Sequence, residues 1–197
     1  MKKKSLALVL ALAMIVVCVV GGTLAWLIAT TGSVTNTFTY GDINIKLEET
    51  DATVSADGSA TKEFKMIPGY TIDKDPKVTV KAGSEKCYLF VKVDKSTNFD
   101  TFMTYEIADG WTQLEDASGN DVDGVFYRVV DTADMGTAYS VLANDRVTVR
   151  DTVTKADMNA LTEATQPTLT FTAYACQYMK NSTESFTAAQ AWNNVTT

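Results

Sequence analysis

The 197-residue sequence contains no histidine. This absence excludes nucleophile pairs of the Ser–His and Cys–His kind, and it excludes every zinc site that is built on histidine. Three cysteines are too few for a small fold held together by disulfides. Three prolines and 11 glycines exclude a collagen-like or low-complexity chain. With 46% hydrophobic and 21% charged residues, the chain is expected to bury a core.

Positive charge is scarce outside the N-terminus. Without the three lysines at positions 2–4, the chain has 14 basic residues against 24 acidic ones, a net charge of −10. Its only arginines are Arg128, Arg146 and Arg150. Because recognition of nucleic-acid phosphates needs clustered lysine and arginine, no nucleic-acid partner is expected.

Residues 1–25 are typical of a secretory signal peptide. The basic Lys2–Lys4 precede Leu6–Val20, which is an unbroken apolar run. A glycine pair and small residues follow, so cleavage is predicted between Ala25 and Trp26. The mature protein is then secreted to the extracellular matrix or cell surface, and only the uncleaved signal segment contacts the membrane. An uncleaved anchor is the alternative, because the uncharged run is long enough to span a bilayer.

The mature chain is predicted to be all-β. Alternation of apolar and polar residues, with period two, predicts strands at 34–40, 43–47, 78–80, 87–93, 125–129, 147–153 and 169–178. Residues 50–60 are predicted to form a loop, and Asp123-Gly124 a turn. Short helices are predicted from Thr154 and from Thr187, at capping signals. Residues 42–197 are therefore predicted to form one antiparallel two-sheet sandwich, jelly-roll-like, with short helical connections.

The 87–93 strand is the most apolar one, and its alternation assigns an inward face. Cys87 shares that face with Leu89 and Val91, which should be deeply buried. Cys176 falls on the opposite phase of the last strand. Two free thiols are therefore favoured over a Cys87–Cys176 disulfide, although export would permit one.

Residues 26–41 form an uncharged N-terminal extension in front of this domain. Val34, Phe38 and Tyr40 alternate with polar residues, as in a strand. Cleavage of the signal peptide would release this strand to complete the sheet of a neighbouring copy, with these three side chains as anchors. The alternative is that the segment pairs within its own domain.

No catalytic or metal-binding residue and no cofactor are predicted, so the chain is not expected to be an enzyme. The oxygen-rich segment 115–124 departs from the EF-hand register and is interpreted as a hairpin loop, with a calcium site as the alternative. The turn at Asp131 has no convincing second aspartate partner for acid protease chemistry. Ser59 and Lys62 form a bare Ser-x-x-Lys motif in a polar loop, without an oxyanion hole.

Three stretches of the sequence resemble a known family. They are Gly21–Trp26 with Ser33–Glu48, then Lys65–Tyr70 with Lys74–Val80 and Tyr88–Val93, and finally Ala173–Gln177 with Ala189–Trp192. Together they resemble the TasA/camelysin family of exported proteins.

The resemblance implies a jelly-roll domain and processing by a SipW-type signal peptidase. It also implies self-association into filaments, as a fibre subunit of a Gram-positive biofilm matrix or as an accessory cell-surface protein. Some members of the family are labelled metalloproteases, but this chain has no His-Glu-x-x-His motif. A camelysin-like metalloprotease and a non-polymerising surface binding module are the alternative functions.

Overall fold

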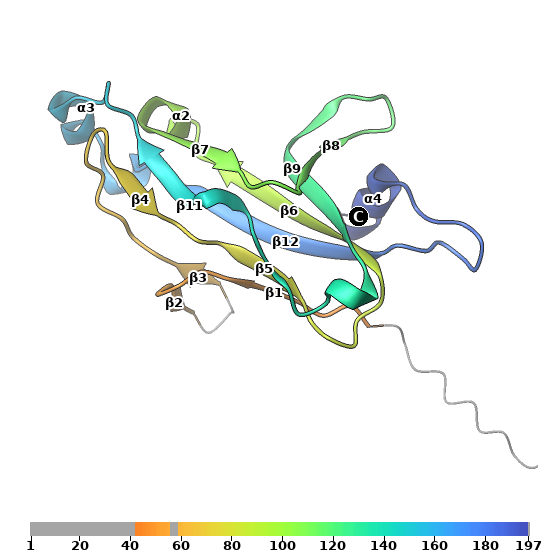
Figure 1. Cartoon of the computed structure of the whole chain (residues 1–197). Coiled ribbons are helices and arrows are strands. Elements are labelled where there is room, and N and C mark those ends of the chain that lie inside the picture. The colour runs from red at the N-terminus through yellow and green to blue at the C-terminus, as the bar shows by residue number, and fades with distance from the viewer. Residues whose placement is uncertain (1–41, 56–58, 197) are drawn as a thin grey trace, which may run out of the picture. The chain divides into compact units, whose positions relative to one another are not determined.

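Figure 1 shows the computed structural model of the chain, which describes residues 42–55 and 59–196. The described residues belong to a unit that begins at Gly41. The predicted signal peptide, the cleavage site at Ala25 and Trp26, and the candidate donor residues Val34, Phe38 and Tyr40 lie outside the described residues.

One layer of the fold is a four-stranded antiparallel sheet in the order β12-β6-β9-β8. Its strands are β6 (Cys87–Lys95), β8 (Thr112–Glu115), β9 (Asp121–Val130) and β12 (Leu169–Gln177). Strand β6 lies at the centre, and β12 runs beside it along its whole length (Figure 1).

The second layer combines two three-stranded antiparallel sheets, β1-β5-β10 and β4-β11-β7. Its strands are β1 (Ile45–Glu48), β4 (Thr71–Asp73), β5 (Lys77–Val80), β7 (Met103–Ile107), β10 (Ala138–Ser140) and β11 (Leu142–Val149). Only Val141 separates β10 from β11, and only residues 74–76 separate β4 from β5, so these pairs continue one another along the chain. A small hairpin of β2 (Thr53–Val54) and β3 (Ala60–Thr61) is appended.

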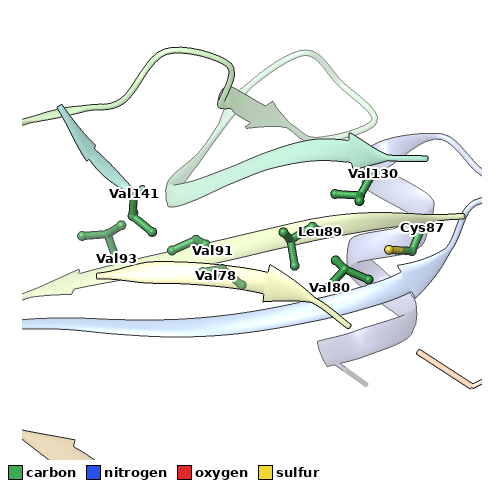
Figure 2. Packing of buried hydrophobic residues seen from close by; sticks show 8 residues of the cluster. All are labelled: Val78, Val80, Cys87, Leu89, Val91, Val93, Val130 and Val141. Atoms are coloured by element: carbon green, nitrogen blue, oxygen red, sulfur yellow. The ribbon is translucent and has the colours of Figure 1, made fainter. Parts of the chain in front are cut away.

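The main core lies between β5 and β6 and confirms the predicted antiparallel sandwich. Figure 2 shows its buried side chains, which are Val78, Val80, Cys87, Leu89, Val91, Val93, Val130 and Val141. As the alternation predicted, Leu89 and Val91 are completely buried. A second cluster extends this core through α2 (Phe99–Phe102), β7 and β11. Non-directional apolar burial of this kind is the main favourable term in folding.

The outer face of β6 is also buried, which simple alternation does not reveal. Tyr88 and Phe90 pack under the C-terminal helix α4 (Ala188–Thr196), whose Trp192 ring lies 5.3 Å from that of Phe90. The helix starts at the predicted capping box, because Thr187 and Gln190 exchange hydrogen bonds. A second capping box at Thr154 starts the helix α3 (Lys155–Asn159), as predicted.

The predicted turn at Asp123-Gly124 is wrong, because both residues lie inside β9. Gly124 has a φ of +66°, and a Cβ atom there would lie 2.4 Å from the carbonyl oxygen of Val93. The register between β8 and β9 shifts at this level. Glycine therefore marks a bulge at a close approach of two strands, not a chain reversal.

Two further boundaries differ from the sequence prediction. The expected loop at 50–60 contains β2 and the first residue of β3. The alternation extends the predicted strand to Val153, but β11 ends at Val149, and Val153 packs into the core from the turn before α3. The prediction is wrong at this position because Val153 is buried without being in a strand. A buried valine in a turn continues the apolar alternation of the strand before it.

Both cysteines of the described part of the chain are free, as favoured by their alternation. Cys87 belongs to the core between the layers, whereas Cys176 belongs to the cluster under α4. Because the two side chains lie on opposite faces of one sheet, their sulfur atoms cannot form a bond without backbone movement.

Candidate assembly edge

Strand β12 forms one edge of the four-stranded sheet, and this edge is the candidate functional site. All nine of its residues pair with β6 in unbroken register. Among the described strands, β6 is its only partner. Natural proteins usually protect a free edge by short length, charge, proline or a bulge. Leu169–Gln177 has none of these protections, because it is long, regular, uncharged and free of proline.

The hydrogen bonds at both ends of β12 show which backbone groups point outward. The Tyr178 N–H donates to the Lys86 carbonyl at 2.9 Å, and the Ser96 N–H donates to the Thr168 carbonyl at 3.0 Å. In an antiparallel ladder, alternate residues bond to the partner strand. Even-numbered residues of β12 therefore bond to β6, and the N–H and C=O groups of Phe171, Ala173 and Ala175 point away from it.

The same residues lie along the side of the sandwich where β12 meets β1 of the second layer. Phe171, Ala173 and Ala175 pack against the main core but are only half-buried, whereas Leu89 of the neighbouring strand is fully buried. Small alanine side chains leave this side of the core less covered. Apolar surface that remains in water is a source of free energy for association.

Strand β1, which belongs to the second layer, contacts β12 but does not pair with it. Its Ile45 is also half-buried against the main core. The Asn44 carbonyl accepts from the Lys81 N–H at 2.7 Å, so Ile45 and Leu47 direct their backbone groups away from β5. We call the region between these two edges the β1–β12 seam.

A buried ion pair lies beside the seam, where it contacts Phe171. The Lys74 ammonium is 2.8 Å from Glu49 Oε2, and both side chains are largely buried, with 12% and 14% exposed. The ammonium also lies 5.3 Å from the ring centres of Phe64 and Phe171. Ion pairing and cation–π contact together compensate the desolvation of this lysine. Glu49 Oε1 has no hydrogen-bond partner among the described residues.

The other motifs singled out in the sequence have structural roles. Asp131 lies 2.8 Å from the Lys86 ammonium, and that hydrogen bond, together with the Thr132 N–H, lowers its pKa. Lys62 donates to the Thr50 carbonyl at 2.7 Å. Of the predicted 115–124 loop, only residues 116–120 lie between β8 and β9, and Asp116 Oδ1 accepts from the N–H groups of Ser118 and Asn120, which closes this turn.

Two kinds of site are absent from the part of the chain that the structure describes. It contains no group of three or more cysteine and acidic residues placed to hold a metal ion. None of its helices is long and apolar enough to cross a membrane. One surface cavity, of about 400 Å³, lies between β8 and the start of α4, and Glu115 and Asp116 supply its charged lining residues.

No family model, curated protein or solved structure matches the chain. The resemblance to the TasA/camelysin family therefore stays a prediction from the residues. Sequence alternation predicted β12 as a strand, but it could not assign β12 to an edge, because edge position depends on which strands pair in three dimensions.

Proposed function

We propose that this chain is a secreted structural protein whose copies join into filaments of a bacterial biofilm matrix or cell surface. The observation that carries the proposal is the β12 edge, which is long, uncharged and unpaired among the described strands. An edge of this kind is a template for a strand of another chain. The motifs that resemble the TasA/camelysin family support the same function.

The strand that joins this edge is proposed to come from residues 26–41 of a second copy. This segment is uncharged, alternates with period two and stands directly before the described domain in the sequence. Its Val34, Phe38 and Tyr40 would cover the half-buried apolar side chains of the β1–β12 seam. Because donor and acceptor are different surfaces, the contact is heterologous and continues into a filament.

Removal of the signal peptide by a SipW-type peptidase is proposed as the step that permits assembly. A segment held at the membrane cannot reach the edge of another copy. N-terminal sequencing of the secreted protein should begin at Trp26. A secreted or membrane-pelleted protein that still begins at Met1 would favour the uncleaved anchor instead.

Ala173→Pro tests the acceptor edge directly. The Ala173 N–H points away from β6, so proline removes a donor for an added strand without removing an internal ladder bond. The variant is expected to fold but to form no filaments in electron micrographs. Leu47→Pro is the matched variant, because Leu47 points its N–H outward from the opposite edge, β1. Loss of filaments in Leu47→Pro alone would assign the acceptor to β1 and refute the β12 proposal.

This function includes no catalytic step. A purified sample should leave a casein-type substrate intact with or without a chelator. Proteolysis that a chelator abolishes, and that survives removal of contaminating proteases, would support the metalloprotease alternative. A mature protein that stays monomeric at every concentration would support a non-polymerising surface binding module.

A further inference from the structure

Arg128 lies between the two layers, on the side of the sandwich away from the β1–β12 seam. It belongs to β9, and its guanidinium carbon is 3.8 Å from the ring centre of Tyr139 in β10. The ring of Trp111, just before β8, is 5.2 Å away. Guanidinium planes stack on aromatic rings in this way, with the N–H groups directed outward in the plane.

Hydrogen bonds and a glycine hold this arrangement in place. The Trp111 indole N–H donates to the Ser140 carbonyl at 2.8 Å, which fixes one ring. The Tyr139 hydroxyl donates to the Asp134 carbonyl at 3.5 Å. Gly110 has a φ of +86°, and a Cβ atom there would lie 2.8 Å from Arg128 Nη2. A glycine at this position therefore keeps space open beside the guanidinium.

The donors of this guanidinium are unused within the described part of the chain. No carboxylate there lies within ion-pair distance of Arg128, and the guanidinium contacts only the two rings among the described residues. The acid whose charge acts on it, Asp134, is too distant to form a salt bridge. Burial lowers the pKa of Arg128, whereas Arg146 is 60% exposed and lies 3.7 Å from Asp73. Partial burial of an unpaired charge is unfavourable until an anion binds it.

We propose that Arg128, with Trp111 and Tyr139, forms a binding site for a carboxylate group. The stacked guanidinium presents a planar fork of N–H donors, which matches the two oxygens of a carboxylate in a bidentate contact. Immobilisation by the rings removes much of the ordering cost of that contact. A carboxylate side chain of a second copy is the favoured source, because the protein has 24 acidic against 17 basic residues. This proposal does not depend on the donor strand.

Fluorescence of Trp111 provides the first test, with sodium acetate as the probe. Acetate should change the emission of the purified protein saturably, and sodium chloride at matched ionic strength should not. Trp111→Phe assigns the signal, and Arg146→Gln is the control, in which the response should persist. Arg128→Gln should abolish the response. Arg128→Lys, which keeps the charge, should weaken apparent affinity roughly tenfold or more, as expected when a charge-assisted hydrogen bond is lost.

Circular dichroism would first establish that each variant is folded, and Arg128→Lys remains informative if Arg128→Gln does not fold. An equal response to chloride and acetate would overturn the proposal. So would an undiminished response in a folded Arg128→Gln or Arg128→Lys variant, or no response of the wild-type protein.

Sedimentation at increasing protein concentration distinguishes the source of the carboxylate. If it belongs to a second copy, the Arg128→Gln variant should self-associate less than the wild type, and free acetate should reduce self-association of the wild type. Self-association that neither of them changes, together with saturable acetate binding, would assign the site to small free carboxylic acids. The deletion of residues 26–40 should leave acetate binding unchanged, which separates this site from the donor-strand proposal.

Discussion

Replacing Leu89 with alanine should destabilise the sandwich strongly. The side chain is fully buried in the first half of β6, with Ala175 and Arg128 as its cross-strand neighbours. Large-to-small substitutions in a core cost about 2–5 kcal/mol, and the value rises when the cavity cannot collapse. Collapse is restricted here because Val78 and Val91, which are also fully buried, belong to strands paired on both sides. The upper half of that range is therefore expected.

Urea denaturation followed by circular dichroism measures this change, provided that the m-value is unchanged. Val129→Ala is the control, because Val129 lies on the adjacent strand β9 and is 42% exposed. That substitution should change the free energy of unfolding by about 0.5 kcal/mol or less. A Leu89→Ala effect as small as the control's would show that the inward face of β6 is assigned wrongly.

Three further outcomes follow from local contacts. Gly124→Ala should destabilise the fold by more than about 1 kcal/mol, and by more than Gly119→Ala does. Of these two positions, only Gly124 would press a Cβ atom against a backbone oxygen. Equal effects of the two substitutions in urea titrations would contradict this. Burial raises the pKa of Cys87 to about 11, so its thiol should resist alkylation at about pH 8 until denaturant is added; peptide mapping that finds a disulfide or rapid alkylation would contradict this. Hydrogen bonds from the Thr154 hydroxyl and N–H lower the pKa of Asp157. Its stabilisation is present above about pH 4 and lost as the pH falls through the folded-state pKa, so the melting temperatures of the wild type and Asp157→Asn should converge as the pH falls below that pKa; a gap independent of pH would refute the assignment.

The sequence predicted the elements that depend only on local residue order. Strand β6 and the start of α4 were predicted because alternation and capping are local properties of the sequence. Strand β7 was not predicted, because its apolar residues come directly after Phe99 and Phe102, which have helical spacing. The helical period and the strand period therefore overlap in this stretch, and neither is clear. Strand β8 was missed because Leu114 is its only apolar residue.

Bulges escaped prediction for a different reason. Asn144 and Asp145 both have positive φ, and the register between β11 and β7 shifts around them. Asparagine and aspartate tolerate this conformation, but they are equally common in ordinary turns. Only strand pairing distinguishes a bulge from a turn, as the misassigned Gly124 also shows.

The candidate sites depend on contacts between distant segments. The β12 edge exists because no described strand pairs on its far side, and the Arg128 site combines residues from β9, β10 and the segment before β8. Neither arrangement leaves a periodic signal in the sequence. The Lys74–Glu49 pair is similar, since its partners lie 25 positions apart.

Electron microscopy of the mature protein beside a variant that lacks residues Trp26–Tyr40 tests the central claim most directly. The account predicts filaments from the mature protein, and from the truncated variant a folded monomer that forms none, because the domain retains its core but lacks a strand to donate. Adding a synthetic peptide of residues 26–41 should shorten the filaments of the mature protein by occupying the β12 edge. A truncated protein that polymerises as well as the full-length mature form would contradict assembly through the N-terminal strand.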